Sequence, residues 1–168
     1  AAEAVFDLQN GFSLSQLEYK QEDQDAAEAI HKYMQEKELL ISPYYAVVKF
    51  DGDNMGELYR KCSAEQQAKL SKEIGRFAKL VPSIMKDYNG MCIYAGGEDF
   101  LGFFPTVKVL PALIALRQEF QKTVKNPVEP ERELTLSAGI AIAHLMPPLK
   151  NVLALADKME HLAKNYPE

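Results

Sequence analysis

From residue 44 onward, short apolar runs rich in β-branched and aromatic residues alternate with segments of helical periodicity, which strongly restricts the possible folds. The runs that predict strands lie at residues 44–50, 91–95, 100–104 and 134–143. Amphipathic spacing predicts helices after the Ser63–Gln66 capping box, over 109–124 and over 149–164. This order predicts an α+β, ferredoxin-like βαββαβ core, with helices on one face of an antiparallel or mixed four-stranded sheet.

Each predicted helix carries an apolar stripe that we expect to face the core. The residues of these stripes are Leu70, Ile74, Phe77, Ala78 and Val81 in the helix after Ser63, Leu110, Leu113, Ile114 and Phe120 in the next, and Leu149, Val152, Leu153, Ala156, Met159 and Ala163 in the last. The core therefore draws on all three helices.

The first 43 residues differ in character and are interpreted as a largely helical N-terminal extension. Residues 1–43 hold nine acidic and three basic side chains, whereas residues 44–168 carry a net charge of +1. A charged helix is predicted over 22–40, and Pro43 prevents its continuation. A solvated surface helix is favoured there, and a docking helix stays an alternative. Residues 44–165 are predicted to form one domain.

Composition excludes several classes of protein. Neither half of the chain has the basic excess of an autonomous nucleic-acid binder, so strong direct binding to nucleic acid is not expected. The two cysteines, Cys62 and Cys92, form neither a disulfide framework nor a zinc motif. Because no apolar run is long enough to cross a membrane and cysteine is scarce, we expect a cytoplasmic protein without membrane contact.

Acidic residues gather at the ends of two predicted strands. One cluster, at 51–54, directly follows a strand, and the other, at 96–99, forms the tip of a hairpin. In the ferredoxin-like order these strands are neighbours, so Asp51, Glu98 and Asp99 are predicted to hold Mg²⁺ or Mn²⁺ with a triphosphate. Asp53 is the last-ranked candidate ligand. Consecutive strand residues point to opposite faces, so Glu98 and Asp99 require a local twist. Each cluster also has a purely structural alternative. Residues 51–54 could form a turn with a helix N-cap, and Gly96-Gly97 could be an ordinary two-residue hairpin turn.

Three other positions have a possible role beside these clusters. Gly56, just inside the next helix, would let a phosphate approach the backbone, or it is merely tolerated by packing. Lys164 shares a helical stripe with Asp157 and His161 and is suited to contact phosphate, or it favours the helix dipole. Ser137, on the long strand, faces either the site or the core.

Four segments together resemble the second palm domain of the large subunit of type III CRISPR effector complexes. They are Phe50-Asp51-Gly52-Asp53-Asn54-Met55-Gly56, Tyr94-Ala95-Gly96-Gly97-Glu98-Asp99, Leu134 to Ala141 and Ala156 to Lys164, the last with the spacing of the related GGDEF diguanylate cyclases. The resemblance covers about residues 44–165. It implies a ferredoxin-like palm that binds Mg²⁺ and ATP and contributes to 3′–5′ synthesis of cyclic oligoadenylates in antiviral defence, when target RNA is bound.

The resemblance also implies roles for particular residues and partners. Asp51, Glu98 and Asp99 would be the catalytic, metal-holding carboxylates. Lys164 would contact phosphate and Ser137 would lie near the nucleotide. The other predicted nucleotide contacts are Gly52, Asp53, Asn54, Gly56, Gly96 and Gly97. The expected partners are ATP, the other subunits of an RNA-guided effector complex, and a second palm that completes the site. An isolated palm is therefore not expected to form product.

The sequence departs from the family at Glu98, where Asp is usual, which lengthens the carboxylate arm by one carbon. Two alternative functions are kept. One is a stand-alone GGDEF-like cyclase that uses GTP as a homodimer, although the 51–56 segment lacks that family's longer Asp-x-Asp-x-Phe-Lys pattern. The other is a degenerate palm that serves as a scaffold for other subunits, which Glu98 and the extension favour.

Overall fold

The computed structural model describes residues 2–9, 11–38 and 42–165. The chain divides into two compact units, Ala1–Pro43 and Tyr44–Glu168. The first unit contains α1 (Ala2–Gln9), the short 3₁₀ helix η1 (Leu14–Gln16) and α2 (Gln21–Glu36). The helix predicted over 22–40 thus ends at Glu36, and positions 39–40 lie outside the described residues. This unit has its own small apolar core around Val5, Leu14 and Ala27.

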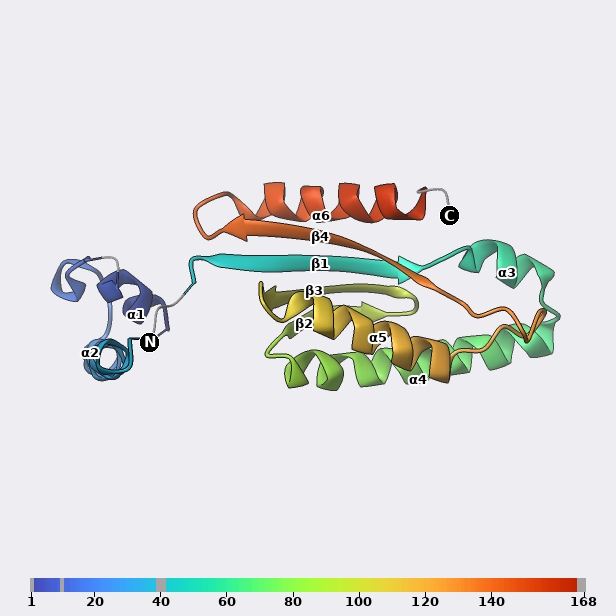
Figure 1. Ribbon diagram of the computed structural model, residues 1–168, viewed down its shortest axis with the longest axis horizontal. Helices are drawn as coiled ribbons and strands as arrows, with labels where there is room; N and C mark the ends of the chain where they lie inside the picture. Colours follow the sequence, from blue (N-terminus) through green and yellow to red (C-terminus); the bar gives the residue numbers. More distant parts are fainter. Residues whose placement is uncertain (1, 10, 39–41, 166–168) are drawn as a thin grey trace. The chain divides into compact units, whose positions relative to one another are not determined.

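The second unit is built on one four-stranded sheet (Figure 1). Its elements are β1 (Tyr44–Gly52), α3 (Met55–Lys61), α4 (Ala64–Asp87), β2 (Met91–Gly96), β3 (Asp99–Pro105), α5 (Val109–Thr123), β4 (Leu136–His144) and α6 (Leu149–Lys164). The strand order is β2-β3-β1-β4, and each neighbouring pair is antiparallel. The predicted α+β, βαββαβ fold is confirmed.

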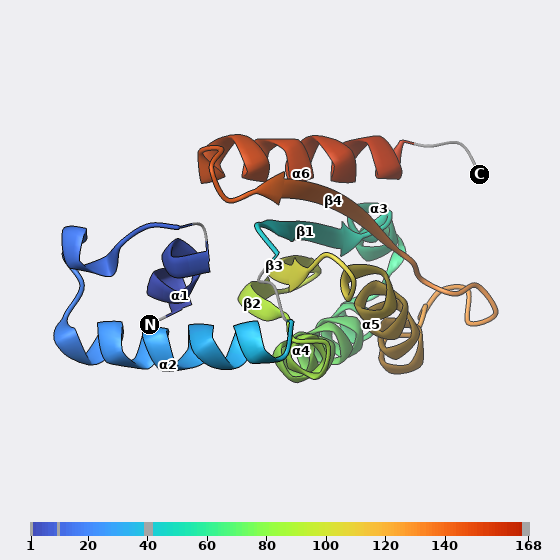
Figure 2. The ribbon, with the colours of Figure 1, turned by 60° about the vertical axis from the view of Figure 1, so that its left-hand side comes forward.

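The helices cover both faces of the sheet, so the expectation of a single covered face was wrong. In both ribbon views α4 and α5 lie on one side of the sheet and α6 lies along β4 on the other (Figures 1 and 2). The reason is visible in β1, where Val47 and Val48 are both fully buried although they point to opposite faces. A strand with apolar residues on both faces requires cover on both.

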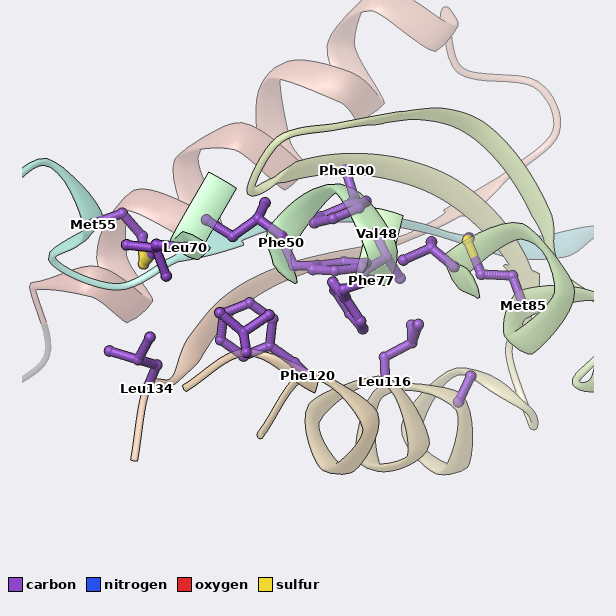
Figure 3. Packing of buried hydrophobic residues seen from close by; sticks show 14 of the residues in the cluster. Val48, Phe50, Met55, Leu70, Phe77, Met85, Phe100, Leu116, Phe120 and Leu134 are labelled. Atoms are coloured by element: carbon purple, nitrogen blue, oxygen red, sulfur yellow. The ribbon is translucent and has the colours of Figure 1, made fainter. Parts of the chain in front are cut away.

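The main core lies between the sheet and the pair α4 and α5 (Figure 3). Phe50 and Phe100 stack across β1 and β3 with ring centroids 4.6 Å apart. Phe77 of α4 meets Phe100 edge-on at 5.4 Å and Phe120 of α5 at 5.1 Å. Gly102 of β3 leaves the room that Met85 fills, because a Cβ there would overlap the Met85 methyl group.

The predicted helix faces are correct for α4 and partly wrong for α5 and α6. The Ser63–Gln66 capping box is formed, and Leu70, Ile74, Phe77 and Val81 are buried. Leu110 and Ile114 of α5, however, are 61% and 58% exposed, and Leu149 of α6 is 46% exposed. The buried stripe of α5 consists instead of Val109, Ala112, Leu116 and Phe120. Because α5 is apolar around much of its circumference, periodicity alone did not identify the buried side.

Within the described residues, no helix combines the length and the apolar character needed to span a membrane.

Candidate functional site

The alternation of β1 directs Lys49 and Asp51 to the sheet face that α6 covers. Their neighbours Val48 and Phe50 belong to the main core, so the two polar side chains point to the opposite face. Asp51 is held at both oxygens: Oδ1 accepts a hydrogen bond from the Gly52 amide at 2.8 Å, and Oδ2 accepts one from Lys164 Nζ. The end of β1 therefore presents a fixed carboxylate beneath the last helix.

The β2–β3 hairpin brings the second acidic cluster to the same place. Phe50 pairs with Phe100, and the Gly52 amide donates to the carbonyl of Glu98 at 3.2 Å. Continuing this register places Asp99 across from Asp51 on one face. Glu98 lies in the two-residue turn rather than in a strand, with Gly97 at φ +65°, so strand alternation does not turn its side chain away from Asp99.

One open cavity of about 420 Å³ lies between this end of the sheet and α6. It is lined by Lys49, Asp51, Gly96, Glu98, Asp99, Glu160, His161 and Lys164. The structure thus brings together five of the predicted site residues: Asp51, Gly96, Glu98, Asp99 and Lys164. The shared cleft between two distant acidic segments was the arrangement that the sequence predicted.

Two other predicted residues lie elsewhere. Asp53 and Asn54 line a different, smaller cavity together with Thr135. Asp53 Oδ2 accepts a hydrogen bond from Thr135 Oγ1 at 2.6 Å, and the Asp53 amide donates to the Thr135 carbonyl at 3.0 Å. These contacts join the start of α3 to the segment before β4, which is the local structural role of a turn.

The remaining predicted positions are small residues. Ser137 is the direct partner of Asp51 across β1 and β4, so it shares the face toward α6. A Cβ at Gly52 would lie 2.6 Å from Met55 Cγ, which shows that the chain is tightly packed there. Gly56 has no other atom within 4 Å of its Cβ position and is open on that side.

Lys164 binds carboxylates from two elements. Its ammonium group donates to Asp51 of β1 and lies 3.2 Å from Oε1 of Glu160, one turn earlier on α6. Partial burial lowers the pKa of Lys164, but the two carboxylates raise it by more, so the net pKa is above its usual value. Lys164 is therefore a permanent cation at the edge of the cavity.

Lys49 and Glu160 are residues of this cavity that the sequence reasoning missed. Lys49 donates to Asp157 of α6, and this hydrogen bond raises the pKa of Lys49, with a further contribution from Asp99. Glu160 is 2% exposed. The signal for Lys49 is a charged residue two positions before Asp51 in an apolar strand, and for Glu160 it is a carboxylate four residues after Ala156 on an apolar stripe.

Gly139 of β4 allows α6 to lie directly on the sheet. A Cβ at this position would overlap the carbonyl oxygen of Ala156 and the amide nitrogen of Glu160, and would lie 2.9 Å from Glu160 Cα. Within the described part of the chain, Asp157, Glu160 and His161 also form a group whose potential ligand atoms all lie within 4.8 Å of one another. The close approach of α6 thus adds the carboxylate of Glu160 to the cavity wall.

The chemistry of the cavity follows from its charges. Four carboxylates and two ammonium groups leave it with a net charge of −2 when His161 is neutral. Oxygen ligands of this kind suit hard divalent cations, whereas the lysines suit phosphate oxygens. The arrangement can therefore bind a metal cation together with a polyphosphate.

Comparison with known proteins identifies the family. Residues 44–168 match the family described as Cas10/Cmr2, second palm domain. The CRISPR system Cmr subunit Cmr2 of Pyrococcus furiosus is 33% identical over 153 residues, an alignment that covers 74% of this chain and 17% of that protein. The chain thus spans about a sixth of the length of this curated relative.

Solved structures support the fold. A Csm1–Csm4 cassette in complex with AMPPNP is similar with a TM-score of 0.58 and 19% identity, covering 73% of this chain and 19% of that one. The active GGEEF domain of a diguanylate cyclase from Vibrio cholerae has a TM-score of 0.55 at 20% identity and covers 83% of both chains. The four-stranded sheet is therefore a cyclase-like palm, and the chain belongs to the Cas10/Cmr2 second palm domain family, found in the large subunit of type III CRISPR effectors.

Proposed function

We propose that this palm binds ATP with Mg²⁺ or Mn²⁺ and contributes to the 3′–5′ nucleotidyl transfer that forms cyclic oligoadenylates in antiviral defence. The observation that carries the proposal is the single cavity that joins Asp51 of β1, Glu98 and Asp99 of the hairpin, and Lys164 of α6. The sequence separates these residues by up to 113 positions, yet the fold gathers them on one face of the sheet.

Asp51, Glu98 and Asp99 are the residues that would hold the divalent cations. Their oxygen donors fit Mg²⁺ or Mn²⁺, which prefer carboxylate ligands. The bound ions would supply electrostatic stabilisation of the phosphates and a lower pKa for an attacking hydroxyl group.

The chain's own residues would orient the nucleotide. Lys164 is charged and lies at the cavity edge, where it can contact a β- or γ-phosphate as a point charge. At the hairpin tip, nothing lies within 4 Å of a Cβ placed at Gly97, so the backbone there is open on that side, whereas the Tyr94 hydroxyl lies against Gly96. Ser137 faces the cavity side of the sheet beside Asp51. Glu98 in the turn is expected to retain metal binding in place of Asp.

A complete active site is proposed to require a second palm. The chain spans 17% of a relative that is a subunit of the CRISPR Cmr system, and the solved neighbour with AMPPNP is a Csm1–Csm4 assembly. Both relatives support other effector subunits as partners, and the second supports an adenine nucleotide as ligand.

The test is Mn²⁺-dependent ATP binding, measured by calorimetry on the full chain. Replacing both Asp51 and Asp99 by Asn is expected to abolish binding, whereas Asp87→Asn, which removes an exposed carboxylate at the end of α4, leaves it unchanged. Equal ATP binding by the wild type and the double variant would show that the site is assigned wrongly.

Nucleotide competition separates the alternatives. Because the GGEEF domain of a diguanylate cyclase shares the fold, a GTP-specific cyclase is the second candidate. Preference for ATP over GTP supports the effector palm, and preference for GTP supports the cyclase. Binding of neither nucleotide, with capture of effector subunits, supports a scaffold.

A further inference from the structure

Glu160 is a buried carboxylate on a helix face that otherwise packs against the sheet with small or apolar residues. Val152, Ala156 and Glu160 follow one another at four-residue spacing, and the side chain of Glu160 is 3% exposed. Its Oε1 atom is buried and accepts no hydrogen bond. Burial of an incompletely paired carboxylate is costly, so its presence here requires a compensating interaction.

Among the residues that the structure describes, the ion-pair partners of the Glu160 carboxylate are basic side chains of the same helix. Oε2 lies 3.1 Å from His161 Nδ1, and Oε1 lies 3.2 Å from Lys164 Nζ, an ion pair without a directed hydrogen bond. The same ammonium group donates to Asp51 of β1. Lys164 therefore lies between a carboxylate on the strand and one on its own helix.

Asp51 cannot bind the Lys164 ammonium group and a divalent cation with equal strength at the same time. A cation on Asp51 repels the ammonium group, and a lysine side chain with four rotatable bonds gains entropy when it swings into solvent. Glu160 offers a second partner one helical turn away, and its burial limits its own motion. It is placed to keep the ammonium group at the cavity when Asp51 changes partner.

We propose that Glu160 is a positioning residue that retains the Lys164 ammonium group at the cavity edge once a divalent cation binds Asp51, so that the ammonium meets the phosphates of the nucleotide. This inference rests on the proposed function for its ligand. The retention of Lys164 itself, however, is a property of the protein and its metal ion, and it can be measured without nucleotide.

The binding test uses the full chain with Glu160→Gln, Lys164→Ala and both changes together. At saturating Mn²⁺, Glu160→Gln is expected to weaken ATP binding about fivefold, as for the loss of one charged contact. Binding of Mn²⁺ alone stays within about twofold, since Asp51 and the hairpin are intact. In the Lys164→Ala background, Glu160→Gln is expected to cause no further loss of ATP affinity. Glu160→Asp, which keeps the charge, is expected to retain part of the ATP affinity.

Two outcomes of this binding test overturn the proposal. An equal loss of Mn²⁺ binding in Glu160→Gln shows that Glu160 is itself a metal ligand. The same loss of ATP affinity with and without Lys164 shows that Glu160 acts independently of the lysine.

A nucleotide-free arm separates this inference from the proposed function. A double-mutant cycle for Glu160 and Lys164, measured by urea unfolding in saturating Mg²⁺, is expected to show a larger coupling than the exposed Glu57–Lys61 pair of α3. If the wild type does not bind ATP but this coupling persists, the proposed function fails and the positioning role stands. A coupling no larger than that of the exposed pair refutes the positioning role.

Discussion

Lys49 in the centre of β1 donates a hydrogen bond to Asp157 of α6, and this ion pair joins the middle strand to the last helix directly beside the acidic cavity. The contact lowers the pKa of Asp157 and raises the pKa of Lys49. Because the Asp157 side chain is 51% exposed, solvent screens much of the interaction.

We expect Asp157→Asn to lower the free energy of unfolding at pH 7 by about 0.5 kcal/mol, as for exposed ion pairs. Asp157 has a depressed pKa in the folded state, so its stabilisation is complete above the usual carboxyl value of 3.8 and is lost as the pH falls through the folded value. Urea unfolding of both proteins at pH 7 and near pH 3 measures the change. A difference that does not shrink in acid would contradict the assignment.

The net charge of −2 in the cavity predicts that ATP binding depends on divalent cations. Chelation with EDTA is expected to weaken ATP binding by at least about tenfold, because a triphosphate is repelled by the carboxylates that line the cavity. AMP, which carries fewer charges, is expected to lose less affinity on chelation. Calorimetry with and without EDTA gives both values, and undiminished ATP binding in EDTA would exclude the metal-bridged mode.

Gly139 of β4 is predicted not to tolerate substitution by alanine. The Cβ of Gly139→Ala would overlap backbone atoms of Ala156 and Glu160, so α6 would have to move away, at a cost of about 3 kcal/mol. Gly75→Ala is the control, because nothing lies within 4 Å of its Cβ and alanine favours the interior of α4, by up to about 1 kcal/mol. Thermal unfolding compares the two variants, and equal melting temperatures would refute the close packing of α6.

Phe77 is expected to be the most costly core residue to truncate. It is fully buried and meets Phe100 and Phe120 edge-on, so Phe77→Ala should lower the free energy of unfolding by about 3–5 kcal/mol. Ile93→Ala on the edge strand β2 is the control, since Ile93 is 51% exposed and the change should cost less than about 0.5 kcal/mol. Urea denaturation measures both.

Much of the fold could be predicted because local signals agree with the tertiary structure. The β-branched runs located all four strands, and α6 begins at Leu149 and ends at Lys164, as the spacing predicted. The continuous apolar run at residues 46–48 is typical of a strand covered on both faces, but the run does not indicate which helix covers which face. That depends on how the chain crosses from β4 to α6.

The site was predictable to the same extent. Asp51 and the 98–99 pair came together because strand order alone places their ends side by side. Lys49 and Glu160 were missed, since their place in the cavity depends on which side of α6 meets the sheet. The metal- and nucleotide-binding roles of the whole set stay predictions.

Two closely packed glycines, one in β3 and one in β4, have a consequence for strand alignment. Gly102 pairs with Val48 and receives Met85 on one face, whereas Gly139 pairs with Lys49 and receives α6 on the other. Residues 46–48 of β1 are apolar on both faces, so over this stretch hydrophobicity alone penalises a shift of the strand only weakly. A one-residue slip of β3 or β4 would instead drive a bulky side chain into a helix, so these glycines enforce the alignment that keeps Asp51 beside the hairpin.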